Sequence, residues 1–353
     1  MPLNVRLPRG WRGLPAGGLL LLLMLQIEGC YYLQAVSGHS DLMSRRRPIG
    51  DVIADSDAPD DLRQRLELVR EARDFSVSAL LLPDNDSYRL YADLERDYAV
   101  WNVFAAPEFS LEPKTWCFPV AGCVAYRGYF SEQAARKMGE KLSFREYDVA
   151  VGGISAYSTL GRFSDPVLNT MMRWSDVDLI VTMFHELAHQ KLYIKGDSAF
   201  NESFATAVAE FGIQRWLEFR GEPERLNAYL ERKELRRGMM ELVSTARTKL
   251  KTLYSGPADR QTMRAEKRSI LDTLSADAET LIEKNGGQFT NWLAAPLNNA
   301  RLVSLHLYEA RLDAFRKILE QCEDELSCFY TRAGALAEMA EADRNQALDA
   351  LAD

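Results

Sequence analysis

The sequence predicts an α+β fold that is mostly helical, with a small mixed or antiparallel sheet beside one amphipathic helix. Three observations support this class. Residues 59–82, and most of the chain after residue 210, carry apolar residues at helical spacing. Residues 87–153 are instead rich in Tyr, Val and Phe with Gly and Pro between them, as in strands and turns. Residues 179–190 then form an amphipathic helix whose polar face carries two of the four histidines of the chain.

The first thirty residues have the composition of a secretory signal. Three arginines precede an apolar run at residues 19–25, and a small residue, Gly29, precedes Cys30. The apolar run is too short for a comfortable membrane-spanning helix, although an uncleaved membrane anchor is the alternative. Either arrangement takes the rest of the chain out of the cytoplasm.

Ile27 and Gly29 before Cys30 resemble a bacterial lipoprotein cleavage box, in which Glu28 is atypical. This resemblance implies that residues 1–29 are a signal peptide and that Cys30 is lipidated. It also implies a lipid-anchored protein that faces the periplasm. Because no Asp follows Cys30, the resemblance favours sorting to the outer membrane.

The helical N-terminal part is expected at residues 31–82. One helix should run from residue 31 to 47, where Pro48 ends it, and a second from residue 59 to 82. The arginines at 45–47 suit a solvated helix end. At a formal net charge of −8, the chain lacks the basic excess that favours nucleic acid as a partner.

The sheet is expected in the part of the chain from residue 87 to 218. Strands are predicted at residues 98–106, 117–129 and 147–151, and a helix at residues 131–142 with Ser131 as its N-cap. The part from residue 222 to 353 is predicted to be helical at 223–254, 257–284 and 312–353. No linker or repeat divides the chain, so we expect one domain over residues 30–353.

Four cysteines remain besides Cys30: Cys117, Cys123, Cys322 and Cys328. In an oxidising compartment an even set can form disulfides. The first pair flanks a short connection that suits a local bridge. The second pair is six residues apart, so a local bridge there needs a break in the helix near residues 323–327. Three connectivities, and free thiols, are compatible with the sequence.

The polar face of the helix at 179–190 carries His185-Glu186-Leu187-Ala188-His189. Two imidazoles four residues apart lie one above the other on a helix, at a separation that suits one zinc ion. The Glu186 carboxylate beside them can take a proton from a water held at the metal. Such a pattern also arises by chance in a chain of this length about once in a hundred, so a third ligand is informative.

Glu202 is the candidate third ligand. The Lys195-Gly196-Asp197 run predicts a turn between two helices, with His189 before it and Glu202 after it. Each lies about 6 Å from the end of the hairpin at 1.5 Å per residue, so the two side chains reach the same height. Glu210 lies two turns deeper, where it could support a ligand without contacting the metal. The alternative for Glu202 is an ordinary acidic residue at a helix start.

His-Glu-Leu-Ala-His-Gln followed by Asn-Glu-Ser-Phe-Ala-Thr resembles the signature of the gluzincin zinc metallopeptidases. This resemblance implies a gluzincin-like zinc lobe, with a helical C-terminal lobe beside it. In the aminopeptidase branch the third ligand is the Glu of an Asn-Glu-Gly-Phe-Ala run. The spacer between His189 and Glu202 is shorter than is usual in that branch, and Ser203 replaces the Gly.

The chain is also similar to a bacterial lipoprotein family described as putative aminopeptidases. The similarity covers the runs at residues 31–38, 117–123, 156–161 and 296–300. In gluzincins an edge strand before the zinc helix pairs with the substrate backbone, and residues 152–161 stand in the corresponding place. A plain hairpin is the alternative. The oxyanion donor is sought among Tyr157, His306 and Tyr308.

The predicted function is therefore a zinc-dependent peptidase of the bacterial envelope, acting on a peptide substrate. His185, His189 and Glu202 hold the metal, and Glu186 passes the proton of the attacking water to the leaving amine. The aminopeptidase assignment rests on the family resemblance, because residues 152–161 lack the carboxylate that binds the substrate amine in gluzincin aminopeptidases. A zinc endopeptidase, and a non-catalytic lipoprotein with a structural zinc, are the alternatives. The sequence does not indicate an oligomeric state.

Overall fold

The computed structural model describes residues 31–118, 122–286, 293, 295–306 and 311–352. Residues 31–44 form one helical unit, and the chain from Arg45 onward forms a second, larger compact unit. The strands of the larger unit are β1 (Arg46–Pro48), β2 (Leu90–Ala92), β3 (Val100–Pro107), β4 (Trp116–Phe118), β5 (Gly122–Val124), β6 (Tyr126–Tyr129), β7 (Tyr147–Ile154) and β8 (Val167–Leu168).

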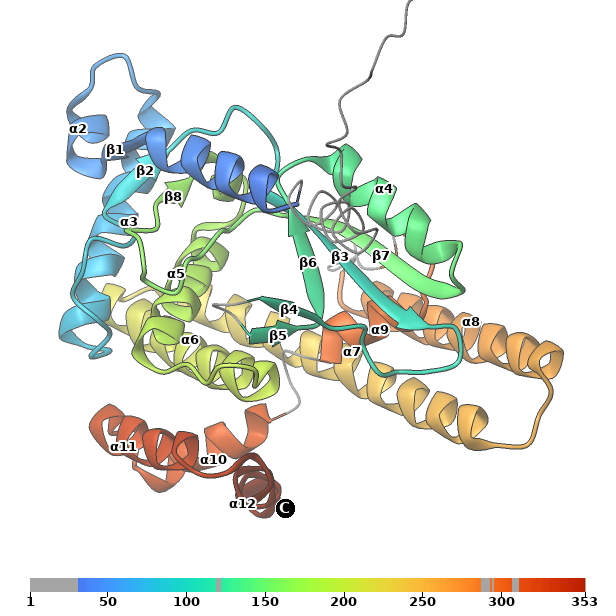
Figure 1. Cartoon of the computed structure of the whole chain (residues 1–353). Helices are drawn as coiled ribbons and strands as arrows, with labels where there is room; N and C mark the ends of the chain where they lie inside the picture. Colours follow the sequence, from blue (N-terminus) through green and yellow to red (C-terminus); the bar gives the residue numbers. More distant parts are fainter. Residues whose placement is uncertain (1–30, 119–121, 287–292, 294, 307–310, 353) are drawn as a thin grey trace, which may run out of the picture. The chain divides into compact units, whose positions relative to one another are not determined.

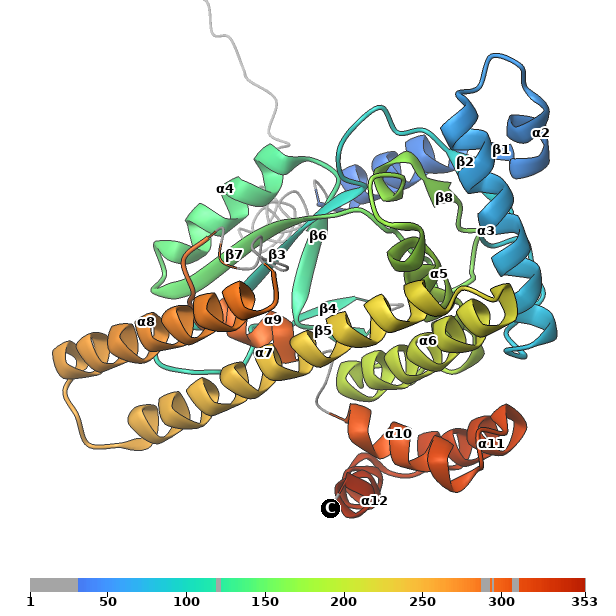
Figure 2. The ribbon, with the colours of Figure 1, turned by 180° about the vertical axis from the view of Figure 1, so that it is seen from behind.

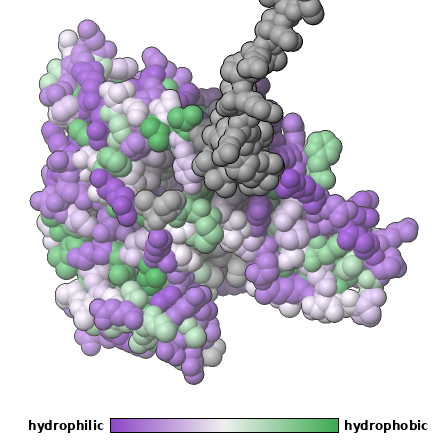
Figure 3. Space-filling model, in the orientation of Figure 1, coloured by the Kyte–Doolittle hydropathy of each residue, from purple (hydrophilic) through white to green (hydrophobic). Residues whose placement is uncertain are grey.

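Helices dominate the larger unit, which confirms the predicted mostly helical α+β class. They are α2 (Ile49–Ala54), α3 (Asp60–Ser78), α4 (Glu132–Ser143), the 3-10 turn η1 (Asn169–Met171), α5 (Asp176–Lys191), α6 (Ser198–Arg220), α7 (Pro223–Ser255), α8 (Arg260–Lys284), α9 (Asn299–His306), α10 (Leu312–Gln321), α11 (Leu326–Ala337) and α12 (Glu341–Ala352). Figure 1 shows α5 and α6 packed side by side between the strands and the C-terminal helices. Hydrophilic residues cover much of the face seen in Figure 3.

The central sheet is antiparallel, with the strand order β6–β3–β7. β7 pairs with β3 from Tyr147 to Ile154 and is therefore an edge strand of this sheet. Helix α4 packs on the sheet at Gly139, where an added Cβ would lie 3.1 Å from Val151 and 3.3 Å from Val149. As predicted, Ser131 caps α4 by accepting a hydrogen bond from Ala134 N.

The structure refines three sequence-based boundaries. The first helix ends at Ser44, because residues 46–48 pair with β2 as strand β1. The single strand expected at residues 117–129 is divided into β4, β5 and β6. Only residues 152–154 of the expected substrate edge belong to β7, and residues 155–161 leave the sheet.

Both disulfides are local. Cys117 pairs with Cys123 directly opposite it across the β4–β5 hairpin. Cys322 pairs with Cys328. The helix is interrupted between α10 and α11, where Glu323 and Asp324 both have positive φ, and this interruption brings the two cysteines together. Of the pairings that the sequence left open, the structure has the local one, together with the helix break that it requires.

Helices α7 and α8 form a long antiparallel hairpin, seen from behind in Figure 2. Pro223 at the first turn suits the start of α7, because proline lacks only an N–H that would have no partner there. Their contact buries an apolar cluster that includes Leu250, Leu274 and, from α9, Leu302. This cluster places α9 between the α7–α8 hairpin and the central sheet.

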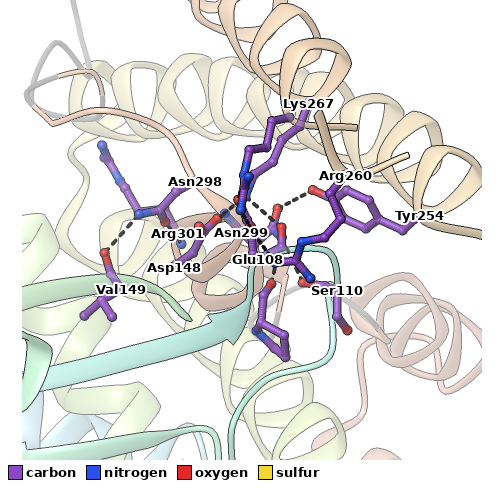
Figure 4. A network of polar contacts seen from close by, with 12 residues as sticks. Glu108, Ser110, Asp148, Val149, Tyr254, Arg260, Lys267, Asn298, Asn299 and Arg301 are labelled. Atoms are coloured by element: carbon purple, nitrogen blue, oxygen red, sulfur yellow. Dashed lines mark hydrogen bonds and ion pairs between the residues drawn. The ribbon is translucent and has the colours of Figure 1, made fainter. Parts of the chain in front are cut away.

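A polar network joins α9 to the ends of β3 and β7 (Figure 4). The fully buried Asn299 amide donates to the carbonyl oxygens of Pro107, Glu108 and Ser110 at 3.0–3.1 Å. Its oxygen accepts from Tyr254 Oη at 2.9 Å. Because a buried amide needs such partners, this one side chain bonds to three carbonyls and fixes the loop after β3.

We expect Asn299→Ala to lower the free energy of unfolding by about 2–3 kcal/mol, because it removes four hydrogen bonds made by a fully buried side chain. Urea unfolding followed by circular dichroism measures this. Asn285→Ala is the matched control, because Asn285 is exposed at the end of α8 and should change stability by less than about 0.5 kcal/mol. Equal effects in the two variants would contradict the role assigned to the network.

Candidate metal centre

Helix α5 carries the two histidines and Glu186. Ser175 caps the helix by accepting a hydrogen bond from Asp178 N at 3.1 Å. Its apolar face is fully packed: Met183, Phe184 and Leu187 are each at most 1% exposed. The opposite face turns His185 and Glu186 toward solvent-accessible space, because both are only partly buried.

The connection between α5 and α6 brings the third side chain back to α5. Asn201 accepts a hydrogen bond from Ile194 N at 2.8 Å and donates to Ile194 O at 2.7 Å. Asp197 caps α6 by accepting from Phe200 N, and its other oxygen accepts from the buried Arg344 at 2.7 Å. These bonds fix the helix that carries Glu202 next to His189.

Three ligand atoms converge. Glu202 Oε2 lies 3.1 Å from His185 Nε2 and 3.7 Å from His189 Nε2, and the two Nε2 atoms are 3.1 Å apart. Ligand atoms of a tetrahedral zinc with bonds of about 2.0–2.1 Å lie about 3.3 Å from one another. The observed separations and the donor set of two imidazoles and one carboxylate fit a zinc ion. Among the described residues, this is the group of His, Cys, Asp and Glu that could hold a metal.

The electrostatics of the triad match a cation site. Burial alone would raise the pKa of Glu202, but hydrogen bonds with His185 and His189 hold this pKa well below its usual range. Burial alone would lower the pKa of His189, but Glu202 and then Glu186 raise it above its ordinary value. Negative charge therefore gathers around the imidazole nitrogens, where a cation would be stabilised.

Two buried groups near Glu186 were missed by the sequence analysis. Burial raises the pKa of Tyr88 and of Asp165, and the charge of Glu186 raises both further, so all three groups lie in one neighbourhood. Tyr88 is 1% exposed and Asp165 is 0% exposed. Neither residue lies in a motif, so no signal in the sequence could have found them.

Glu210 does not support a ligand, which corrects the expectation for this residue. Its carboxylate accepts two hydrogen bonds from Arg316 Nη2 at 2.9 Å and pairs with Lys233 at 3.0 Å. Glu210 therefore joins α6 to α7 and α10. Glu210 does lie two helical turns after Glu202 on α6, as the helical period predicts. The sequence could not show that two cations from later helices, Arg316 and Lys233, reach its carboxylate.

Ser203, which stands where the aminopeptidase branch has Gly, has a structural role. It is fully buried, and its Oγ accepts a hydrogen bond from Arg311 N at 3.1 Å, just before α10. The Ser therefore fastens the start of α10 beside Glu202.

The structure describes the side chain of only one of the three candidate oxyanion donors, Tyr157. The Tyr157 ring packs against Phe130 with the ring centres 5.5 Å apart. His306 is the last residue of α9, and its side chain lies outside the described part. Tyr308 also lies outside the described residues. The role of each as an oxyanion donor stays a prediction.

Comparison with known protein families gives a match over most of the chain. Residues 30–348 match the protein family described as "Putative aminopeptidase". No curated protein and no solved structure matches the chain.

Proposed function

Because the chain belongs to the putative aminopeptidase family, we propose that it is a zinc-dependent peptidase, and more narrowly an aminopeptidase, of the bacterial cell envelope. The observation that carries the proposal is the convergence of His185, His189 and Glu202 beside the Glu186 carboxylate. Zinc, when bound, supplies the Lewis acidity that activates a water and polarises a peptide carbonyl.

Three residues of the chain would hold the metal, and a fourth would act as the general base. His185 and His189 offer Nε2 atoms, and Glu202 offers Oε2. Glu186 holds the proton of the attacking water on its carboxylate and returns it to the leaving amine. Its carboxylate forms no hydrogen bond or ion pair with any described residue, which leaves its oxygens available for this task.

Two alternatives differ from this proposal in their measurable consequences. A zinc endopeptidase would use the same four residues but cut inside a peptide. A non-catalytic lipoprotein with a structural zinc would bind the metal without hydrolysis. The Glu186 carboxylate, which bonds to none of the residues that the structure describes, favours an enzyme, because a structural site needs no general base.

A peptide-library digest with the purified soluble protein tests the function. We expect hydrolysis that a chelator abolishes and added zinc restores. Removal of single residues from the N-terminus supports the aminopeptidase, whereas internal cuts support the endopeptidase. A stoichiometric zinc with no hydrolysis of any library peptide would leave the structural-zinc alternative in place of the peptidase.

We also propose export and lipidation at Cys30, which lies outside the described residues. The order of basic, apolar and small residues before Cys30 supports it. Within the described part of the chain, no helix has the length and apolar character needed to cross a membrane. Mass spectrometry of the membrane fraction should detect an acylated N-terminal Cys30, and a cytoplasmic chain that retains Met1 would refute the proposal.

A further inference from the structure

A tight turn between β7 and β8 is held by one buried carboxylate. Asp165 accepts hydrogen bonds from Thr159 N at 2.9 Å and from Thr159 Oγ1 at 2.7 Å. Ser158 Oγ donates to the same carboxylate at 3.4 Å. Leu160 and Gly161 both adopt positive φ, at 57° and 74°. This backbone is costly for Leu160, so the bonds to Asp165 are what maintain the turn.

The turn lies against the helix that carries the general base. A Cβ added to Gly161 would lie 2.9 Å from Gln190 Cδ and Oε1, so the turn touches this side chain directly. Gln190 is four residues after Glu186 in α5. Residues at this spacing share one helix face, so the turn lies beside the stripe of α5 that carries Glu186.

The segment at residues 85–88 forms hydrogen bonds with both Gln190 and Asp165. Asn85 donates to Gln190 Oε1 at 2.8 Å, which fixes the side chain that Gly161 contacts. Tyr88 N donates to Asp165 O at 2.7 Å. Asp165 N donates to Ser87 Oγ at 3.3 Å. The turn is therefore set at a fixed position relative to α5, and its residues 161–163 are exposed.

We propose that the turn at residues 159–163 is a wall of the substrate cleft next to Glu186, and that Asp165 is the positioning residue that fixes it. The inference rests on the proposed peptidase function and extends it. The hydrogen bonds of Asp165 go to residues 158–159 and 87–88, and an added Cβ at Gly161 meets Gln190 first, so moving the wall should disturb the substrate and leave the metal in place.

Gly161→Ala is the first test, because its new Cβ would clash with the end of the Gln190 side chain, so that either Gln190 leaves its bond with Asn85 or the turn moves. The matched control is Gly221→Ala. Gly221 has a similar φ of 67°, caps α6, and has nothing within 4 Å of an added Cβ. Both variants carry the same left-handed backbone strain, but only Gly161→Ala disturbs the contact between the proposed wall and Gln190. The probe is the peptide that the library digest shows to be cleaved fastest.

We expect Gly161→Ala to lower kcat/KM by about 10²-fold, since a displacement of about 1 Å can have this effect. Zinc content should stay at the wild-type level. The dissociation constant of the probe peptide should rise in a Glu186→Gln, Gly161→Ala double variant relative to Glu186→Gln alone, which is a readout independent of turnover. Gly221→Ala should keep wild-type kinetics.

Substitutions at Thr159 are a second test of the wall, and they introduce no steric clash with Gln190. Thr159→Val removes the hydroxyl bond to Asp165, and we expect a raised KM, whereas Thr159→Ser keeps the hydroxyl and should restore the wild-type value. If Gly161→Ala and Gly221→Ala have equal kinetics while the wild type cleaves the probe, the wall proposal is wrong and the peptidase stands. If the wild type shows no chelator-sensitive cleavage, the peptidase proposal is wrong, and the wall proposal that rests on it is wrong as well.

Discussion

Glu186→Gln should bind zinc with wild-type stoichiometry and unfold at the wild-type temperature, yet lose peptide hydrolysis. The amide has the shape of the carboxylate but cannot accept the proton of the attacking water. Positioned acid–base groups contribute about 10²–10⁴-fold to rate, so we expect a loss of at least that size in kcat. Initial rates on the best library peptide, together with elemental analysis of the same sample, measure both properties.

Glu218→Gln is the matched control for this change. Glu218 is an exposed glutamate on α6, and its replacement should leave the rate and the zinc content unchanged. Wild-type turnover in Glu186→Gln would end the proposed mechanism. If the wild type itself binds zinc without turnover, the metal is structural.

Glu202→Ala should lose the metal. The substitution removes one of three converging ligand atoms and leaves His185 and His189 without their carboxylate partner. Loss of a group that merely supports a ligand typically weakens metal affinity 10–100-fold, so loss of a ligand should weaken it by at least about 100-fold. Competition with a chromogenic chelator measures the affinity, and activity should fall in parallel.

Glu210→Ala separates this effect from general damage to α6. It removes another partly buried glutamate of the same helix, and with it the bonds to Arg316 and Lys233. We expect lower stability with unchanged zinc affinity. Unchanged zinc affinity in Glu202→Ala would exclude Glu202 from the ligand set.

The local parts of the fold could be predicted because their causes are local. Helical spacing and the cap Ser131 determine where α4 begins, since an N-cap acts within a few residues. The turn at residues 195–197 set the length of the α5–α6 connection. Because this connection is short, the sequence predicts that Glu202 lies opposite His189.

Only the tertiary structure decided what surrounds Glu186. Asp165, Tyr88 and Gln190 come together through bonds between segments that are far apart in the chain, such as Asn85 with Gln190. The same holds for Glu210, whose partner Arg316 lies on a later helix. The sequence alone determined the candidate metal site of His185, His189 and Glu202, because a helix and one short turn bring these residues together. The cleft wall and the pairing of buried charges depend on how distant elements pack, and no local periodicity encodes that packing.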